Sequence, residues 1–169
     1  RDSLLRQFGM VLQDTCLFEG TIAENIAFGK PEASRREIEE AARRSGAHEF
    51  IRRLDKGYES LICADSDMLS QGQRQLVAIT RVLLMDPRML ILDEATSSID
   101  TLSERHVNQA MELLMKGRTS FIIAHRLSTI TDADLILVME QGDIVEQGTH
   151  EALLQAGGAY AELFNSQFT

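Results

Sequence analysis

A helix followed directly by a buried strand, over residues 68–94, is the feature that most constrains the fold of this chain. Ser70 and Gln73 have the spacing of a capping box, which predicts that a helix begins here, and Pro87 would end it. Residues 89–92 form a short apolar run without alternation, which is typical of a parallel strand covered on both faces. The stretch therefore predicts an α/β protein with a predominantly parallel sheet.

Two carboxylates, Asp93 and Glu94, follow this strand at its carboxyl end, where open α/β sheets bind their ligands. Such a pair suits a site in which one carboxylate holds Mg²⁺ and the other polarises a water molecule. A strand that simply ends in an acidic surface loop would show the same two residues. For the pair alone, that is the simpler interpretation.

Two further apolar runs also end in a polar side chain. Gln13 follows residues 8–12, and His125 follows residues 119–124. If the three strands are parallel neighbours, these side chains and the two carboxylates meet at one edge of the sheet. A glutamine can orient a water or complete a Mg²⁺ shell, and a histidine can bond a phosphate oxygen, so the set suits phosphoryl transfer. The loop that cradles phosphates, G-x-x-x-x-G-K-[ST], does not occur in residues 1–169.

Composition and charge narrow the class of protein. The 169 residues suffice for one domain with a core, and the net charge of −9 argues against a surface dedicated to nucleic acid. Cys16 and Cys63 are far apart, which indicates a reducing compartment and no cysteine metal site. No apolar run reaches the length of a membrane span, so any membrane role must come through another segment or subunit.

A second capping box, formed by Ser34 and Glu37, predicts another helix, and Gly46 is a suitable C-terminal stop for it. Beyond the third apolar run we expect a hairpin with its turn at residues 141–143, and two short helices at residues 151–155 and 160–165.

Taken together and in this order, five short motifs are similar to those of one family. They are a signature motif at residues 69–73, a Walker B strand at 89–94, a D-loop at 98–100, the switch histidine His125 and the Q-loop glutamine Gln13. The sequence thereby resembles the nucleotide-binding domain of ATP-binding cassette (ABC) transporters, in particular the multidrug- and lipid-exporter type, over essentially its whole length.

This resemblance implies a P-loop NTPase-like ABC ATPase core, with a helical subdomain over about residues 20–85 and a catalytic-core part over residues 1–19 and 86–169. It implies ATP and Mg²⁺ as cofactors, with Asp93 and Gln13 serving the metal ion. Glu94, His125 and Gln13 would be the catalytic residues. Contacts with the nucleotide and the opposing subunit would come from Ser70, Gln71, Gly72, Gln73 and Asp100.

The resemblance also implies partners and a place in the cell. Two such domains pair head to tail, so we expect a second nucleotide-binding domain, in a homodimer or a heterodimer, and the coupling helices of a transmembrane domain. The region from Gln13 up to Leu54 would receive those helices, with Phe18 in contact. The expected function is ATP hydrolysis that powers export of a drug, lipid or peptide, at the cytoplasmic face of the cell membrane and without a nucleic-acid partner.

Departures from the family pattern leave alternatives open. The Walker A loop is missing, so we expect a domain truncated before the Q-loop and no ATP turnover by this stretch alone. Gln71 replaces the first glycine of the usual signature, a variant that suits pairing of two different subunits. One alternative is therefore a degenerate or regulatory half of a heterodimeric transporter. Another is an ABC ATPase of DNA repair, which would call for long heptad arms or a basic surface, and the sequence has neither.

Overall fold

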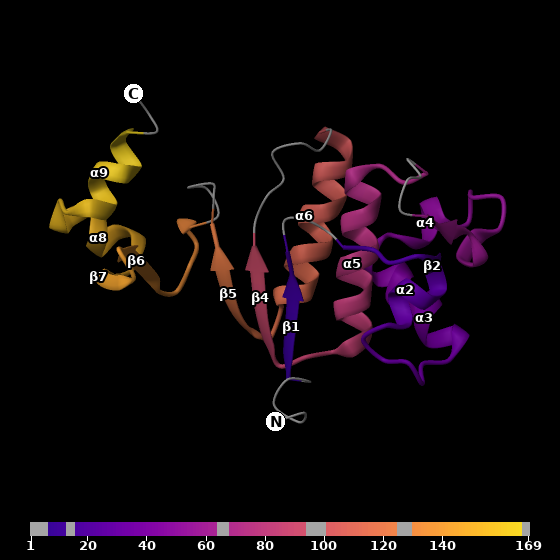
Figure 1. Ribbon diagram of the computed structural model, residues 1–169. Coiled ribbons are helices and arrows are strands. Elements are labelled where there is room, and N and C mark those ends of the chain that lie inside the picture. Colours follow the sequence, from indigo (N-terminus) through magenta and orange to yellow (C-terminus); the bar gives the residue numbers. More distant parts are fainter. Residues whose placement is uncertain (1–6, 13–15, 64–67, 94–100, 125–129, 167–169) are drawn as a thin grey trace. The chain divides into compact units, whose positions relative to one another are not determined.

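The computed structural model describes residues 7–12, 16–63, 68–93, 101–124 and 130–166 (Figure 1). The chain divides into two compact units, residues 1–123 and 124–169. The first unit contains β1 (Phe8–Val11), β2 (Gly20–Thr21), α2 (Ile22–Ala27), α3 (Arg35–Ser45), α4 (His48–Ile51), the 3₁₀ turn η1 (Gly57–Glu59), β3 (Leu61–Ile62), α5 (Gln71–Met85), β4 (Met89–Asp93), α6 (Thr101–Met115) and β5 (Thr119–Ile123). The second contains β6 (Ile136–Glu140), β7 (Asp143–Gly148), α8 (His150–Ala156) and α9 (Ala159–Ser166).

Three parallel strands form the main sheet of the first unit, in the order β1-β4-β5. Met10 pairs with Ile91, and Ile91 pairs in turn with Phe121 across the sheet. The order and direction confirm that the three apolar runs are parallel neighbours in an α/β fold. Because all three strands run the same way, the segments that follow them leave the sheet at one edge.

One face of this sheet belongs to a hydrophobic core that also contains residues of α5 and α6. Val11, Leu90 and Leu92 are almost completely buried on this face. Gly9 allows β1 to approach α5 closely, since a Cβ there would lie 2.5 Å from Cγ1 of Val82. Burial on this side explains why every second residue of β1 and β4 is small or apolar.

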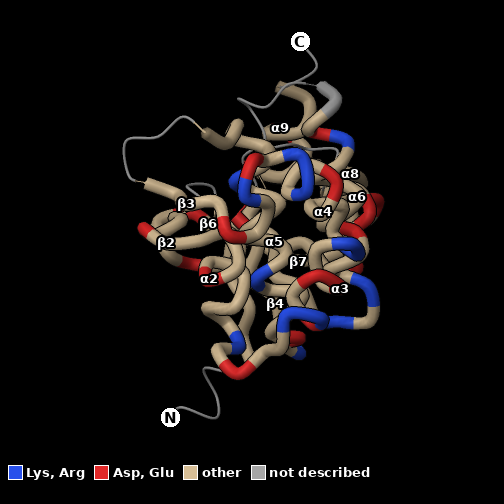
Figure 2. Tube along the Cα trace, turned by 90° about the vertical axis from the view of Figure 1, so that its right-hand side faces the viewer, with Lys and Arg blue, Asp and Glu red and all other residues tan. Residues whose placement is uncertain are grey.

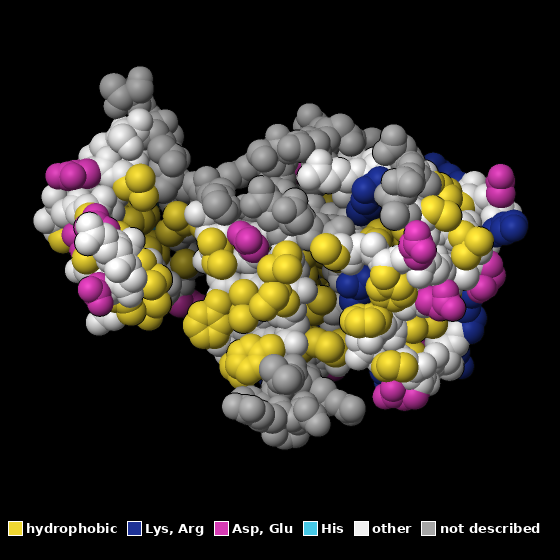
Figure 3. Space-filling view, viewed as in Figure 1, with side chains coloured by type: hydrophobic (Ala, Val, Ile, Leu, Met, Phe, Trp, Pro, Cys, Tyr) yellow, Lys and Arg dark blue, Asp and Glu magenta, His cyan; other side chains and the backbone are white. Residues whose placement is uncertain are grey.

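The other face of the sheet is open in the first unit. Met10, Phe121 and Ile123 are each more than half exposed, at 52%, 53% and 54%. Hydrophobic side chains accordingly gather over β1, β4 and β5 (Figure 3). An apolar surface of this kind favours association, because covering it removes it from water.

Capping boxes begin three helices of the first unit, α2, α3 and α5. The two predicted boxes, at Ser34 and at Ser70, are thereby confirmed, and Gly46 ends α3 in the left-handed conformation with φ of 80°. Acidic and basic residues alternate along α3, and ion pairs such as Arg35–Glu39 link them on its solvated side (Figure 2). The buried side of α3, like α2, packs against α5.

The second unit is a β-hairpin with two helices. Gln141 and Gly142 join the antiparallel strands β6 and β7, and their φ values of 50° and 95° suit a two-residue hairpin turn. The Glu146 carboxylate accepts hydrogen bonds from the N–H groups of Ala159 and Tyr160 at 2.9 Å each, where α9 begins. The predicted hairpin and the two predicted terminal helices are confirmed.

Candidate functional site

The start of α5 carries the predicted signature residues. Ser70 is the N-cap, and its hydroxyl oxygen accepts a hydrogen bond from the Gln73 N–H at 3.3 Å. The Gln73 side-chain oxygen in turn accepts the Ser70 N–H at 3.0 Å. Gln73 therefore orders the first turn of the helix and holds Ser70 at its end.

This helix start has the chemistry of an anion site. The Ser70 hydroxyl uses a lone pair in the cap, so its proton stays available for donation to a phosphate oxygen. Gln71 and Gly72 supply the first two N–H groups, which have no acceptor within the helix. Ser70 and Gln71 are exposed, whereas Gly72 is buried. The fifteen-residue helix adds the positive end of its dipole at this point.

Asp93 is the last residue of β4, half-buried and in register with Ile123 of β5. The neighbouring strand β1 ends at Val11, so all three strands end at the same edge of the sheet. Four predicted site residues lie outside the residues that the structure describes, and their positions stay predictions: Gln13, Glu94, Asp100 and His125.

The start of α5, which Ser70 caps, and the end of β4, where Asp93 stands, lie toward the same end of the first unit, as the ribbons of α5 and β4 show (Figure 1). The short link over residues 86–88 turns the chain from α5 back into β4, so the helix runs opposite to the strand. Asp86 makes this turn in the left-handed conformation, with φ of 52°. The start of the helix and the end of the strand therefore come to one end.

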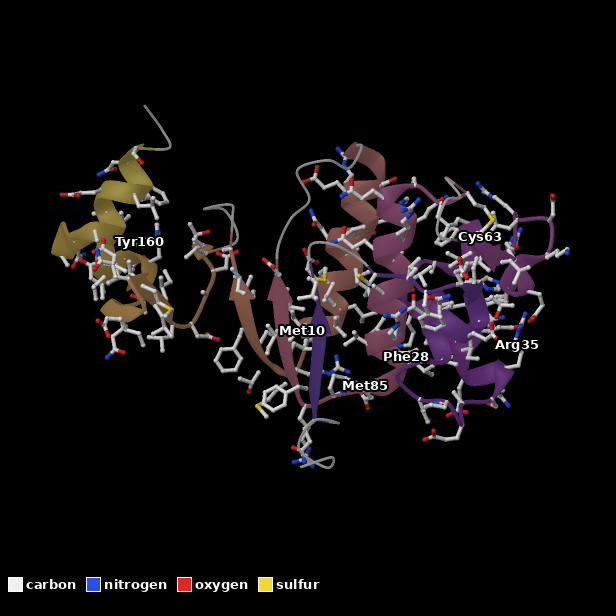
Figure 4. All side chains as sticks on the ribbon, viewed as in Figure 1. Met10, Phe28, Arg35, Cys63, Met85 and Tyr160 are labelled. Carbon is white, nitrogen blue, oxygen red and sulfur yellow. The ribbon has the colours of Figure 1, made fainter. Side chains whose placement is uncertain are left out.

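Phe18 and Phe28 form an exposed aromatic pair, with ring centroids 5.1 Å apart. Phe18 was predicted as a contact for the coupling helices, which stays a prediction, and Phe28 was not predicted. Phe28 is the more exposed of the two, at 65%. It directly follows α2, and its place is labelled in Figure 4. A signal for it was present in the sequence, since a large apolar side chain directly before Gly29 and a polar turn does not fit the pattern of a core position.

Away from the start of α5, the described residues offer a hollow and no cluster of metal ligands. A shallow, open hollow is lined by Arg53, Leu54, Asp55, Lys56, Ser60, Leu61 and Met68. It includes neither Ser70 nor Asp93, so it is not the predicted nucleotide site. Over the described ranges no cluster of three or more His, Cys, Asp or Glu side chains could hold a metal ion. Asp93 alone still fits Mg²⁺, which commonly binds one or two carboxylates and takes its other ligands from water and phosphate.

None of the helices in the described part of the chain has the length and apolar character needed to cross a bilayer.

Comparison with known proteins supports the motifs and the fold. The family profile described as "ABC transporter" matches residues 1–97, more than half of the chain. The uncharacterized ABC transporter ATP-binding protein YfiC of Bacillus subtilis (strain 168) is 51% identical over 168 residues, which are 99% of this chain and 28% of that protein. The ATP-dependent lipid A-core flippase of Chromohalobacter salexigens is 54% identical over 165 residues, which are 98% of this chain and 28% of the flippase.

A solved structure agrees as well. The structure of a bacterial Atm1-family ABC exporter with ATP bound is similar with a TM-score of 0.87 and 43% identity, over 99% of this chain and 29% of that one. The chain spans about 28% of the length of the curated relatives that it matches. The order of the motifs, the parallel sheet and the similar proteins all indicate the same family. The chain belongs to the ABC transporter family.

Proposed function

We propose that this chain is part of the ATP-binding and ATP-hydrolysing module of an exporter, which powers efflux of a drug, lipid or peptide. The observation that carries the proposal is the start of α5, where the Ser70 hydroxyl and two helix amides form an anion-binding end in a member of this family. A relative named as a putative multidrug export protein supports export as the direction, and relatives named as a lipid A-core flippase and a fatty acid transporter support a lipid as one class of cargo.

The sheet edge would supply the chemistry of hydrolysis. Asp93 would hold Mg²⁺, and Glu94, directly after it, would polarise the attacking water. Gln13 would complete the shell of the ion or orient the water, and His125 would bond the γ-phosphate. Mg²⁺ would neutralise charge on the phosphates during transfer. The common edge at which β1, β4 and β5 end supports this grouping.

The first expected partner is a second nucleotide-binding domain, paired head to tail. In this arrangement the Ser70 end of one domain faces the ATP that the other domain holds, and Asp100 contacts the opposing subunit. The exposure of Ser70 and Gln71 supports such a contact, since an anion-binding helix end needs access to its ligand.

The second expected partner is the transmembrane part of the same transporter. We infer that its coupling helices dock on the pair Phe18–Phe28, within the region from Gln13 to Leu54, at the cytoplasmic face of the membrane. An aromatic side chain that is 65% exposed and held in place by a second ring is a good anchor for an apolar partner. Relatives named "ATP-binding/permease protein" support a permease in the same polypeptide.

An alternative is a regulatory half of a heterodimeric transporter. Gln71 favours it, because this exposed side chain stands at the first helical position, where the usual signature has a glycine. A role in DNA repair is disfavoured by the exporter names of the relatives.

The substitution Glu94→Gln in the full-length transporter separates the two remaining functions. Loss of a general base costs about 10²- to 10⁴-fold in rate, so single-turnover hydrolysis should fall by at least about a hundredfold while ATP still binds. Unchanged hydrolysis would reject the catalytic role of Glu94 and favour the regulatory half.

A further inference from the structure

Arg81, on the outer side of the signature helix α5, contacts two segments that precede that helix in the sequence. Its Nε donates to the carbonyl oxygen of Asn25 at 2.8 Å, and one Nη donates to the Asn25 side-chain oxygen at 3.3 Å. The other Nη donates to the carbonyl oxygen of Cys16 at 3.4 Å. One guanidinium thus joins α5 to α2 and to the segment that follows β1.

Asn25 extends this connection to the aromatic pair. Its side chain is fully buried, accepts the Phe18 N–H at 3.1 Å and donates to the Phe18 carbonyl oxygen at 3.0 Å. A second donation, to the Thr21 carbonyl oxygen at 3.0 Å, fixes the amide from the other side. The backbone at Phe18 is therefore held by a side chain that Arg81 itself holds.

The guanidinium also lies against both aromatic rings. Its central carbon is 5.7 Å from the ring centroid of Phe18 and 5.5 Å from that of Phe28. Burial lowers the pKa of Arg81, and a partly desolvated cation interacts more strongly with aromatic faces and carbonyl oxygens. Among the described residues, the partners of the Arg81 cation are carbonyl oxygens and aromatic rings. These contacts stabilise the guanidinium and hold the two exposed rings in place.

The turn after Phe28 is packed equally closely on the helix. A Cβ at Gly29 would lie 3.2 Å from the carbonyl oxygen of Arg81 and 3.2 Å from Cβ of Met85. Phe28 therefore cannot move far without moving α5. On that helix Arg81 is eleven residues from Ser70, or about 16 Å along the axis, within one continuous α-helix.

We propose that Arg81 is a positioning residue, which makes the aromatic pair Phe18–Phe28 and the signature helix move as one body. This inference rests on the proposed function. A displacement of the membrane part that is docked on the two rings passes through Arg81 and Asn25 into α5, and so changes the position of Ser70 relative to the nucleotide on the opposing domain. Arg81 touches neither nucleotide nor reacting atoms; its effect is on geometry alone.

The test uses the full-length transporter in liposomes of phosphatidylethanolamine and phosphatidylglycerol, with ATP and Mg²⁺ as the only added ligands. The variants are Arg81→Met, Arg81→Lys, Phe28→Ala and the double variant with Phe28→Ala and Arg81→Met. Arg88→Met is the control, because Arg88 is an exposed arginine in the link that follows the same helix. Rates are divided by the amount of folded transporter, measured as binding of a fluorescent ATP analogue.

Arg81→Met should lower kcat about tenfold, the size of losing one hydrogen bond to a charged group, and leave KM for ATP within about twofold. Arg81→Lys keeps the charge and loses the fork of donors, so it should recover only part of the rate. The double variant should be no slower than Arg81→Met, because both substitutions cut the same connection.

Three results would overturn the inference. Arg81→Met kinetics equal to those of Arg88→Met would remove the positioning role and leave the proposed function standing. Multiplying effects of Phe28→Ala and Arg81→Met would show that the two residues act separately, as in a purely structural role. A wild-type transporter that hydrolyses no ATP would overturn the proposed function itself, and the inference with it.

Discussion

Replacing Ser70 by alanine should lower ATP turnover far more than replacing Ser34, although the two serines are matched as helix caps. Each is exposed, and each accepts a hydrogen bond from the N–H three residues on at 3.3 Å. Alanine at either position removes a cap, which costs about 1 kcal/mol of unfolding free energy. Because α3 and α5 pack against each other in one unit, the two losses of stability should be similar.

The two hydroxyl groups differ in what they can still donate. The Ser34 hydroxyl donates to the Glu37 carboxylate at 2.8 Å, so its proton is already used. The Ser70 hydroxyl faces Gln73, which bonds the Ser70 N–H, and can donate to phosphate. Loss of a hydrogen bond to a charged group costs about 1.5–3 kcal/mol, or roughly ten- to a hundredfold in kcat/KM. Ser34→Ala should stay within about twofold of the wild type.

The assay measures kcat/KM for ATP and the urea midpoint of the same full-length transporter in both variants. A similar shift in the urea midpoint together with a loss of turnover in Ser70→Ala alone would support a direct role at phosphate. Equal losses of turnover in the two variants would refute it, since Ser70 would then act only as a cap.

Two further predictions concern the first unit by itself. Lys30 and the Ser34 N–H hold the pKa of Glu37 at about 2, below its ordinary value of 4.5. The ionised carboxylate therefore stabilises the fold above pH 4.5, and this contribution is lost as the pH falls toward 2. Glu37→Gln should reduce the change of the urea midpoint between pH 4.5 and 2, and the same change in variant and wild type would contradict the assignment. Phe121 is 53% exposed on β5, so Phe121→Lys should reduce self-association of the 169-residue chain in sedimentation velocity, and the same association state in both proteins would show that the open sheet face is not responsible.

Sequence patterns that extend over only a few residues were sufficient to predict several helices and strands of the fold. A capping box needs only two side chains three positions apart, and the boxes at Ser34 and Ser70 are present. The continuous apolar run at residues 89–92 predicted a parallel strand covered on both faces; the parallel strand is confirmed, whereas full cover is found on one face of the sheet only. The sequence could not show that one face of that sheet would be open at Met10 and Phe121, because the pattern reports apolarity and not what covers it.

The candidate site was predicted as a set of residues, and the structure describes the positions of only part of that set. The start of α5 at Ser70 and the end of β4 at Asp93 lie at one end of the first unit, because the link at residues 86–88 turns the helix back into the strand. The roles of Gln13, Glu94, Asp100 and His125 rest on motif order, and these residues lie outside the part of the chain that the structure describes.

Arg81 shows why the remainder of the site could not be predicted. In the sequence it is one of two arginines on its helix, and the simplest interpretation of such a residue is a solvated charge. Its partner Asn25 is 56 positions away, on a helix of only six residues, and no periodicity relates the two. Only the packing of α2 on α5 brings the amide, the guanidinium and the two rings together. Residues that act by joining elements are therefore found from tertiary contacts, whereas residues that act by their own chemistry at a strand end or a helix start can be found from local pattern.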